Sequence, residues 1–485
     1  MWGSLAHFPI DLDSVPFHGN SEGRRLLGCR VRNGLVFAIC AAFSAGLLLL
    51  TAVPATAQVY PSTFQGQRDI HGFVNTIYRT RNIEGESDQD FYQYWNIEAE
   101  ELVPGRASGA FSLRLNTDLD GRVDGAPGLG TYVFDRDPFY SVDDARNDRE
   151  YVDLYTGYID LYNGTPDNGY LRIGRQYLQE WDYIHADAVK LELPVSSAVK
   201  LKGFFGQAVS FYSGHTNDWT GGVGVEIAPS YGNRWWFGYD KYADDIADND
   251  SYTAETWQSP WEGAWFHARF RGLDDEARDL DLNLSQYFTP LDLTLFVDVH
   301  RLFSKLEDES RHHSPFYRTD LLEEQPYTSY SFRFDKALPC NFGLSGGFGI
   351  RRVSENEQDY GNRDWEHGDV TLSFYPTNTW YYSISAEWWN TDPDSSFFGY
   401  SGEIGYRPNK CIDWTLGSSY GNYVFRYEDE RFPGLYRESP FIKTYYTGLR
   451  WRVNETNNLR INFEIEDDDR GEDYYSLRLN WGQTF

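Results

Sequence analysis

Most of this chain alternates apolar and polar side chains with a period of two, and that pattern limits its fold more than any other feature. The C-terminal stretch SLRLNWGQTF (476–485) places Leu477, Leu479, Trp481 and Phe485 on one face, and Ser476, Arg478, Asn480, Gly482 and Thr484 on the other. This is the pattern of a β-strand with one apolar and one polar side. The apolar side would face the core of a soluble sandwich, or the lipid around a membrane barrel.

The same alternation recurs along the chain, and the number of strands separates these two folds. It is clear in GAFSLRLNTD (109–118), LDLNLSQ (280–286), WYYSISAEW (380–388) and LRINFEIE (459–466). About twenty such strands would need a very large sandwich, because sheets rarely exceed about ten strands without curling or closing. Closing the sheet removes its edges. We therefore predict an all-β protein, an antiparallel up-and-down transmembrane barrel over residues 70–485.

Composition excludes several other classes. Aromatic residues make up 17 % of the chain, which argues against disorder despite a net charge of −30. A single methionine and few long apolar runs argue against a helical membrane protein. The negative charge also argues against a nucleic-acid partner.

The N-terminal region has the features of an export signal. Arginines precede the apolar run 34–53, and Ala55-Thr56-Ala57 follows it. We predict a signal peptide cleaved before Gln58, with residues 1–23 as a spurious extension, so that 1–57 is removed and 58–69 forms a short periplasmic segment. A retained signal-anchor helix and a twin-arginine signal are the alternatives.

Connections between the strands alternate between short turns and long acidic stretches, as expected for periplasmic turns and outer loops. The short turns are LPVSS (193–197), APSYGN (228–233), TPLD (289–292), LPCN (338–341), YPTNT (375–379), RPNK (407–410) and VNETN (453–457). The acidic stretches are 242–250, 305–313, 354–364, 390–395, 426–434 and 466–473. The segment 120–149 is either another outer loop or a constriction folded into the lumen.

Counting the segments gives about 21 strands, whereas single-chain barrels usually have an even number. The regular order of turns fails between residues 244 and 325, so one strand there is missed or invented. We predict about 20 strands, within a range of roughly 18 to 22. Cys340 and Cys411 lie beside different turns, so no disulfide between them is expected.

At this point the chain resembles a Gram-negative outer-membrane porin. The resemblance rests on the signal peptide, the strand–turn rhythm and the terminal Phe485, with Leu477, Leu479 and Trp481 at alternate positions of a barrel-assembly signal. Gln483 departs from that signal. YLRIGRQYL (170–178) resembles the Gly-Arg-Gln strand of substrate-selective and alginate-type porins, in which the arginine lines the channel. Here Arg175 shares its parity with Leu171 and Ile173, so it would face the lumen only if a bulge intervened.

For a channel, the candidate functional residues are charges that alternation places inward. They are Arg114, Asp118, Arg172, Glu387, Arg450, Arg452, Arg460, Glu464 and Arg478, together with Asp281 and Glu466. Opposed basic and acidic rows could select permeants. Alternatively, these charges form salt bridges that hold the wall and contribute little each. Inward Tyr381, Tyr446 and Tyr474 either stack on sugars or fill space.

We predict no enzyme activity, no metal centre and no cofactor, apart from loosely bound divalent cations at the acidic outer loops. The expected partners are outer-membrane lipid and lipopolysaccharide, the barrel-assembly machinery, and either further copies of the chain or a multihaem cytochrome. The predicted function is a porin for small hydrophilic solutes or ions in the outer membrane. The alternative is a barrel that sheathes a cytochrome and insulates an electron conduit.

Overall fold

The computed structural model describes twelve stretches and one isolated residue of the chain. They are residues 70–83, 86–119, 150–162, 164, 166–181, 184–209, 219–243, 248–304, 325–354, 363–391, 395–429, 432–469 and 473–485. The predicted signal peptide, the segment 58–69, the segment 120–149 and the acidic stretch 305–313 lie outside this described part. Within it, no helix is both long and apolar enough to cross a membrane.

Almost all of the described chain is β-strand. The strands are β1 (Ile70–Ile83), β2 (Glu86–Val103), β3 (Ala107–Asp118), β4 (Glu150–Tyr162), β5 (Tyr170–Leu178), β6 (Ile184–Ser196), β7 (Val199–Ala208), β8 (Trp219–Ser230), β9 (Asn233–Ala243), β10 (Asp248–Gln258), β11 (Ala264–Leu273), β12 (Glu276–Phe288), β13 (Leu293–Leu302), β14 (Tyr327–Leu338), β15 (Phe342–Val353), β16 (Trp365–Phe374), β17 (Trp380–Thr391), β18 (Ser395–Asn409), β19 (Ile412–Asp429), β20 (Phe432–Glu438), β21 (Phe441–Arg452), β22 (Asn457–Asp468) and β23 (Asp473–Thr484). Single 3-10 turns occur at η2 (Pro166–Asn168), η3 (Thr289–Leu291) and η5 (Pro339–Asn341).

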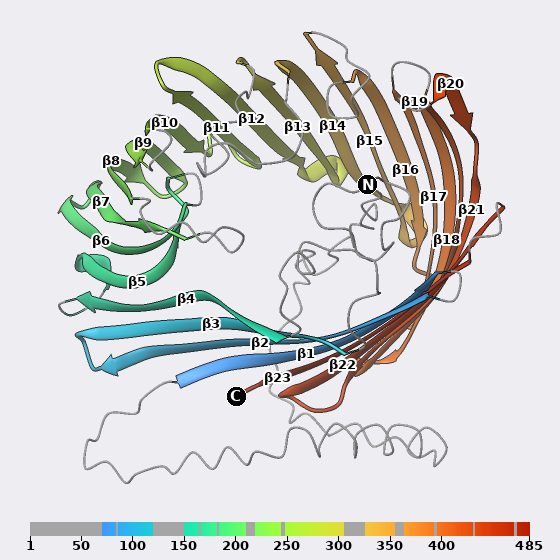
Figure 1. Cartoon of the computed structure of the whole chain (residues 1–485), viewed down its shortest axis with the longest axis horizontal. Helices are drawn as coiled ribbons and strands as arrows, with labels where there is room; N and C mark the ends of the chain where they lie inside the picture. Colours follow the sequence, from blue (N-terminus) through green and yellow to red (C-terminus); the bar gives the residue numbers. More distant parts are fainter. Residues whose placement is uncertain are drawn as a thin grey trace.

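The strands form one closed antiparallel barrel (Figure 1). Each barrel strand pairs with the next one in sequence, and β1 pairs with β23 to close the wall. The short β20 pairs with the C-terminal residues of β19, whereas the rest of β19 pairs with β21 in the barrel wall. The barrel therefore consists of 22 of the 23 described strands. The predicted architecture is confirmed, and the strand number lies at the top of the predicted range.

Two sequence-based assignments need correction. The strand missed between residues 244 and 325 is β10, whose first three residues belong to the predicted acidic stretch 242–250. Its outward side carries Tyr252, Ala254 and Thr256, a row too weakly apolar to stand out in the sequence. The acidic stretch 426–434 is also not a plain loop, because it includes the end of β19 and the start of β20.

The predicted short turns all join hairpins at the end of the barrel where the chain terminates. Two of them need backbone in the left-handed region, with φ of 44° at Asp292 and 64° at Cys340. Asp and Asn tolerate this conformation better than most residues, and TPLD and LPCN supply Asp292 and Asn341 there. Cys340 is a free, exposed thiol, in agreement with the expectation of no disulfide to Cys411.

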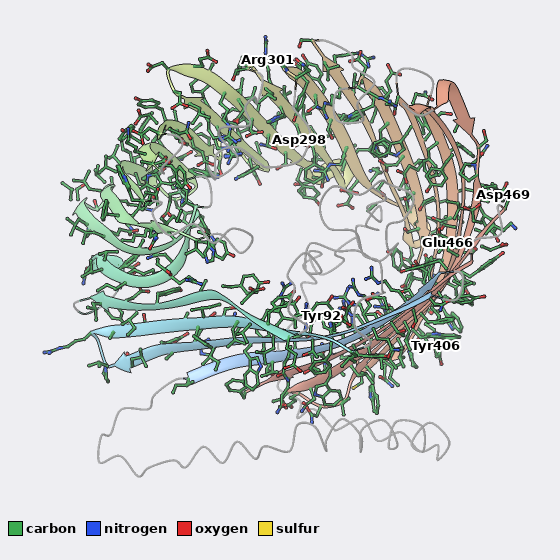
Figure 2. All side chains as sticks on the ribbon, viewed as in Figure 1. Tyr92, Asp298, Arg301, Tyr406, Glu466 and Asp469 are labelled. Carbon is green, nitrogen blue, oxygen red and sulfur yellow. The ribbon has the colours of Figure 1, made fainter. Side chains whose placement is uncertain are left out.

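The two faces of the wall differ in the chemistry of their side chains. Figure 2 shows Tyr92 and Asp298 on the interior side and Arg301 and Tyr406 on the outside. Cross-strand partners share a face, so these positions fix the facing of every row. Large apolar side chains stand exposed along the outside, among them Val223, Ile384 and Phe205 at 62 %, 61 % and 64 % exposure. This apolar exterior is what lipid requires of a barrel.

The barrel also has a buried apolar cluster, and it lies on the interior face. It consists of Leu178, Trp181, Ile184, Ala186, Ala188, Phe204, Trp236, Tyr242 and Leu273, from β5 to β11 and the β5–β6 turn. In β6 the buried residues alternate with exposed Val189, Leu191 and Leu193 on the other face, so both faces of this strand are apolar over part of its length. Strict alternation predicts a polar interior face for every strand, so this cluster departs from the sequence-based expectation.

Candidate functional site: the barrel interior

In the first half of the barrel, inward arginines pair with carboxylates on the adjacent strand. Arg114 of β3 lies 2.9 Å from Asp153 of β4, and Arg172 of β5 lies 2.7 Å from Asp160 of β4. Arg172 also stacks on the Tyr158 ring at 3.7 Å. These contacts run along the wall between neighbouring strands. They match the ladder alternative for Arg114 and Arg172, in which the charges hold the wall together.

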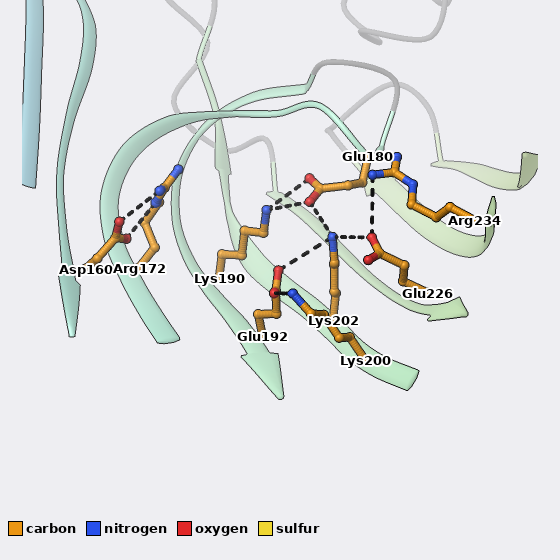
Figure 3. A network of polar contacts seen from close by, with 9 residues as sticks. All are labelled: Asp160, Arg172, Glu180, Lys190, Glu192, Lys200, Lys202, Glu226 and Arg234. Atoms are coloured by element: carbon orange, nitrogen blue, oxygen red, sulfur yellow. Dashed lines mark hydrogen bonds and ion pairs between the residues drawn. The ribbon is translucent and has the colours of Figure 1, made fainter. Parts of the chain in front are cut away.

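The β5–β6 turn folds inward over this wall (Figure 3). Trp181 at its tip is fully buried and packs on Phe204 at 4.7 Å and edge-on against Trp236 at 5.2 Å between ring centroids. The turn is tied by two backbone hydrogen bonds, from Trp181 N–H to the Leu178 carbonyl and from Ile184 N–H to the Trp181 carbonyl. The tip is therefore fixed to the interior face by apolar packing.

Glu180, next to Trp181, joins the turn to two lysines of the wall. Its carboxylate accepts from Lys190 Nζ of β6 at 2.8 Å and from Lys202 Nζ of β7 at 2.9 Å. Lys202 also contacts Glu226 at 3.0 Å and Glu192 at 3.5 Å. Burial alone would raise the pKa of the Glu180 carboxyl, but the two ammonium groups outweigh it and lower this pKa to about 2. Glu180 is therefore a permanent anion at neutral pH.

None of the residues of this turn network was singled out from the sequence. Glu180 and Trp181 lie in the connection between β5 and β6, where strand alternation cannot predict which way a side chain points. Lys190 and Lys202 do lie on the inward parity of β6 and β7, so their charges in otherwise apolar strands were a usable signal.

The second half of the interior, from β14 to β22, differs in charge. Here inward carboxylates lie among small and hydroxyl side chains: Asp335, Asp369, Glu387, Glu403, Glu464 and Glu466. Among the described residues, no lysine or arginine lies within ion-pair distance of Asp335, Asp369, Glu464 or Glu466. The side chain of Glu387 is 44 % exposed. These carboxylates add negative charge to this half of the interior, which also carries the inward Arg333, paired with Asp298 at 3.5 Å.

Three of the remaining predicted arginines lie toward the end of the barrel where the chain terminates, because register places Arg450 directly beside Arg460, and Arg452 beside Asn458. Arg478 lies mid-strand in β23 beside Arg79, which pairs with Asp90. Asp118 lies at the opposite end, at the last position of β3 and beside Asp90. The predicted set thus divides into wall pairs, an acidic sector and a basic end group.

Arg175 is on the outside of the barrel. The pairing of β5 with β4 and with β6 continues without a register shift, so no bulge turns this residue inward. Its guanidinium lies 2.7 Å from Asp187 on the same outer face. The arginine of the Gly-Arg-Gln tripeptide therefore does not line the interior here.

The three tyrosines predicted to face inward lie on the interior side of the barrel wall. Tyr381, Tyr446 and Tyr474 share the inward rows, and the Tyr446 hydroxyl donates to Glu403 at 3.1 Å. In the described part of the chain, no three His, Cys, Asp or Glu side chains are grouped to hold a metal ion. Divalent cations at the outer loops stay a prediction.

The proposed assembly signal forms the outer face of the closing strand. On this outer face, Leu477, Leu479 and Trp481 lie opposite Thr80, Tyr78 and Thr76 of β1, respectively. Phe485 exchanges two backbone hydrogen bonds with Gly72, at 3.0 and 3.1 Å, at the seam. Their role in recognition by the assembly machinery stays a prediction.

A closed 22-strand barrel with an apolar exterior and a largely polar interior defines the class by its fold: this chain has the architecture of an outer-membrane β-barrel. No protein-family model matches it, and none of the curated proteins does. Among solved structures, the translocation pore of the P pilus usher PapC matches with a TM-score of 0.50 and 9 % identity, over 86 % of this chain and all of that one (100 %). This likeness supports the fold.

Two structures from Pseudomonas aeruginosa also match at lower similarity. OpdQ gives a TM-score of 0.41 at 10 % identity, over 87 % of this chain and 99 % of its own. OccK9 (OpdG) gives 0.38 at 10 % identity, over 86 % and 98 %.

Proposed function

We propose that this barrel is a water-filled channel for small hydrophilic solutes or ions, with a preference for cations. The observation that carries the proposal lies in the acidic sector of β14 to β22, where Asp335, Asp369, Glu464 and Glu466 face the interior. Among the described residues, no lysine or arginine lies within ion-pair distance of these four carboxylates. The basic residues of the first half are largely neutralised by wall pairs. Rings of carboxylates favour cations in wide pores.

The stretches predicted as acidic outer loops extend the same proposal to the cell surface. In a chain with a net charge of −30, carboxylates in such loops would raise the local concentration of cations at the mouth. Divalent cations held there would bridge the loops to lipopolysaccharide phosphates. The basic end group of Arg450, Arg452 and Arg460 would form the last selective element before the periplasm.

The test is the reversal potential of the refolded mature protein in a planar bilayer under a KCl gradient. The proposal predicts open channels with a reversal potential of cation sign. Replacing Glu464 and Glu466 together by glutamine should move the reversal potential toward zero. The matched control is Asp467→Asn, which directly follows Glu466 on β22 but faces outward and pairs with Lys443 at 2.9 Å; it should leave the reversal potential unchanged. Absence of conductance, or an anion sign, would contradict the proposal.

A further inference from the structure

Four aromatic side chains form a continuous row on the interior face of β16 to β19. His367, Trp389, Phe397 and Tyr423 are successive cross-strand partners, and we call this row the aromatic band. Ring centroids lie 4.6 Å apart for His367 and Trp389 and 4.5 Å apart for Phe397 and Tyr423. Each ring is only partly buried. The band is therefore an inward aromatic surface, distinct from aromatic girdles, which face lipid.

Two glycines of the wall leave room for the Phe397 ring to lie close against it. A Cβ on Gly399 would lie 2.5 Å from the Phe397 ring, and one on Gly421 would lie 2.8 Å from it. Phe397 therefore occupies the space that these side chains would fill. A ring lying along the wall has its other face turned to the interior, where it can stack on a flat ligand.

Carboxylates and then hydroxyl groups follow the band along the inward face of the same strands. The next row holds Asp369 and Glu387, and Glu387 accepts a hydrogen bond from Trp389 Nε1. Below it runs a hydroxyl row of successive partners on five strands: Thr371, Ser385, Ser401, Ser419 and Thr444. From the band to the hydroxyl row, the described inward positions of β16 to β19 carry no lysine or arginine.

This chemistry favours one kind of ligand. Asp369 and Glu387 would repel an anion, and the charge of Glu387 is already engaged by Trp389 and by His367 at 3.4 Å. Aromatic faces, carboxylate acceptors and hydroxyls together match a neutral sugar, whose ring has an apolar face and hydroxyls at its edge. Four strands span about 14 Å, room for about two or three sugar rings in a row.

We propose that the aromatic band and the hydroxyl row form a binding subsite for neutral oligosaccharides in the channel. This inference rests on the proposed channel function and names a class of solute for it. A few placed polar groups beside an apolar surface are typical of small-molecule sites. Weak binding of this kind would speed passage of the sugar by raising its concentration inside the barrel.

The test is transient block of single-channel current by maltohexaose, with a polyethylene glycol of similar size and tetraethylammonium as comparison probes. We expect concentration-dependent block by maltohexaose alone. Phe397→Ala and, separately, Trp389→Ala should raise the half-blocking concentration about tenfold, which corresponds to the loss of about 1.4 kcal/mol. Phe398→Ala, the next residue but on the lipid face and 55 % exposed, should leave block unchanged.

The outcomes separate this inference from the channel function. Open channels without maltohexaose block, block that both interior variants leave unchanged, or block only by tetraethylammonium would overturn the sugar subsite and leave the channel intact. Absence of conductance in the wild-type chain would contradict the channel function itself. Phe397→Leu, which keeps an apolar side chain but removes the flat ring, should also weaken block and guards against misfolding of the alanine variant.

Discussion

At position 180 one carboxylate holds an inward turn against the wall through two lysines. The Lys190 and Lys202 side chains are only 6 % and 7 % exposed, so these charges depend on their partners rather than on water. Removing one member of a buried ion pair costs far more than removing an exposed one, because it leaves an uncompensated charge. Lys202 keeps Glu192 and Glu226, whereas Glu180 is the acidic partner of Lys190.

We therefore predict that Glu180→Gln lowers the free energy of unfolding by about 3 kcal/mol. The measurement is urea unfolding in lipid vesicles at pH 7. Glu276→Gln, a fully comparable change at an exposed position where β12 begins, should have almost no effect. Equal effects of the two variants would show that the turn network does not stabilise the barrel.

The same carboxylate gives a pH dependence with a defined sign. The pKa of Glu180 is lowered from an ordinary 4.5 to about 2 in the folded chain. A lowered pKa means stability that is present above the ordinary value and lost as the pH falls through the folded value. The difference in unfolding free energy between wild type and Glu180→Gln should stay constant from pH 7 to about pH 5 and shrink below it. A difference that grows on acidification would contradict this account.

At the scale of the strand, alternate residues of one strand meet two different solvents. Ile384 of β17 is 61 % exposed on the outer face, whereas its neighbour Ser385 lies inward in the hydroxyl row. An arginine on the lipid face near the bilayer midplane costs about 2–4 kcal/mol. An inward arginine at position 385 stays in water and has carboxylates nearby.

We predict that Ile384→Arg lowers the unfolding free energy in vesicles by about 2–4 kcal/mol, while Ser385→Arg changes it by less than about 1 kcal/mol. Both variants place the same side chain on the same strand, one residue apart, so the comparison isolates the environment. If Ser385→Arg were the more damaging change, the assignment of faces for β17 would be reversed.

Individual strands also show what the sequence could and could not reveal. Periodicity placed β3, β12, β17, β22 and β23 and the facing of their charges, because strong outward rows of leucine, isoleucine and aromatics mark each one. It missed β10, whose outward row is weak, and the inward β5–β6 turn, because a turn has no period from which to read its direction. It also could not separate wall pairs from unpaired carboxylates, since pairing depends on the residue opposite and hence on register.

At the scale of the whole molecule, the account depends on the meeting of the two ends of the sheet. An open sheet of this length would leave two unpaired edges, and an interior with its own solvent exists only if the wall is continuous. The seam is made by β1 and β23, and Phe485 is hydrogen-bonded to Gly72 at the end of the seam where the chain terminates. Every functional proposal made for the interior requires this seam.

The seam can be tested directly by an engineered cross-link between its two strands. Asn75 and Gly482 are register partners, three positions along the ladder from Gly72 and Phe485, which exchange two backbone hydrogen bonds. Hydrogen-bonded and non-hydrogen-bonded pairs alternate in an antiparallel ladder, so Asn75 and Gly482 form a non-hydrogen-bonded pair. Such pairs have Cα atoms about 4.5 Å apart, within the reach of a disulfide. The chain for this test carries Asn75→Cys and Gly482→Cys, with its four native cysteines replaced by serine.

The measurement is the gel mobility of the denatured chain after oxidation in the membrane, with and without reductant. The account predicts an intramolecular disulfide in nearly every folded chain, seen as a reductant-sensitive shift of the monomer band. The offset pair Asn75→Cys and Ser476→Cys should give none. Absence of the cross-link in the matched pair, or cross-linking only between different chains, would contradict a closed barrel.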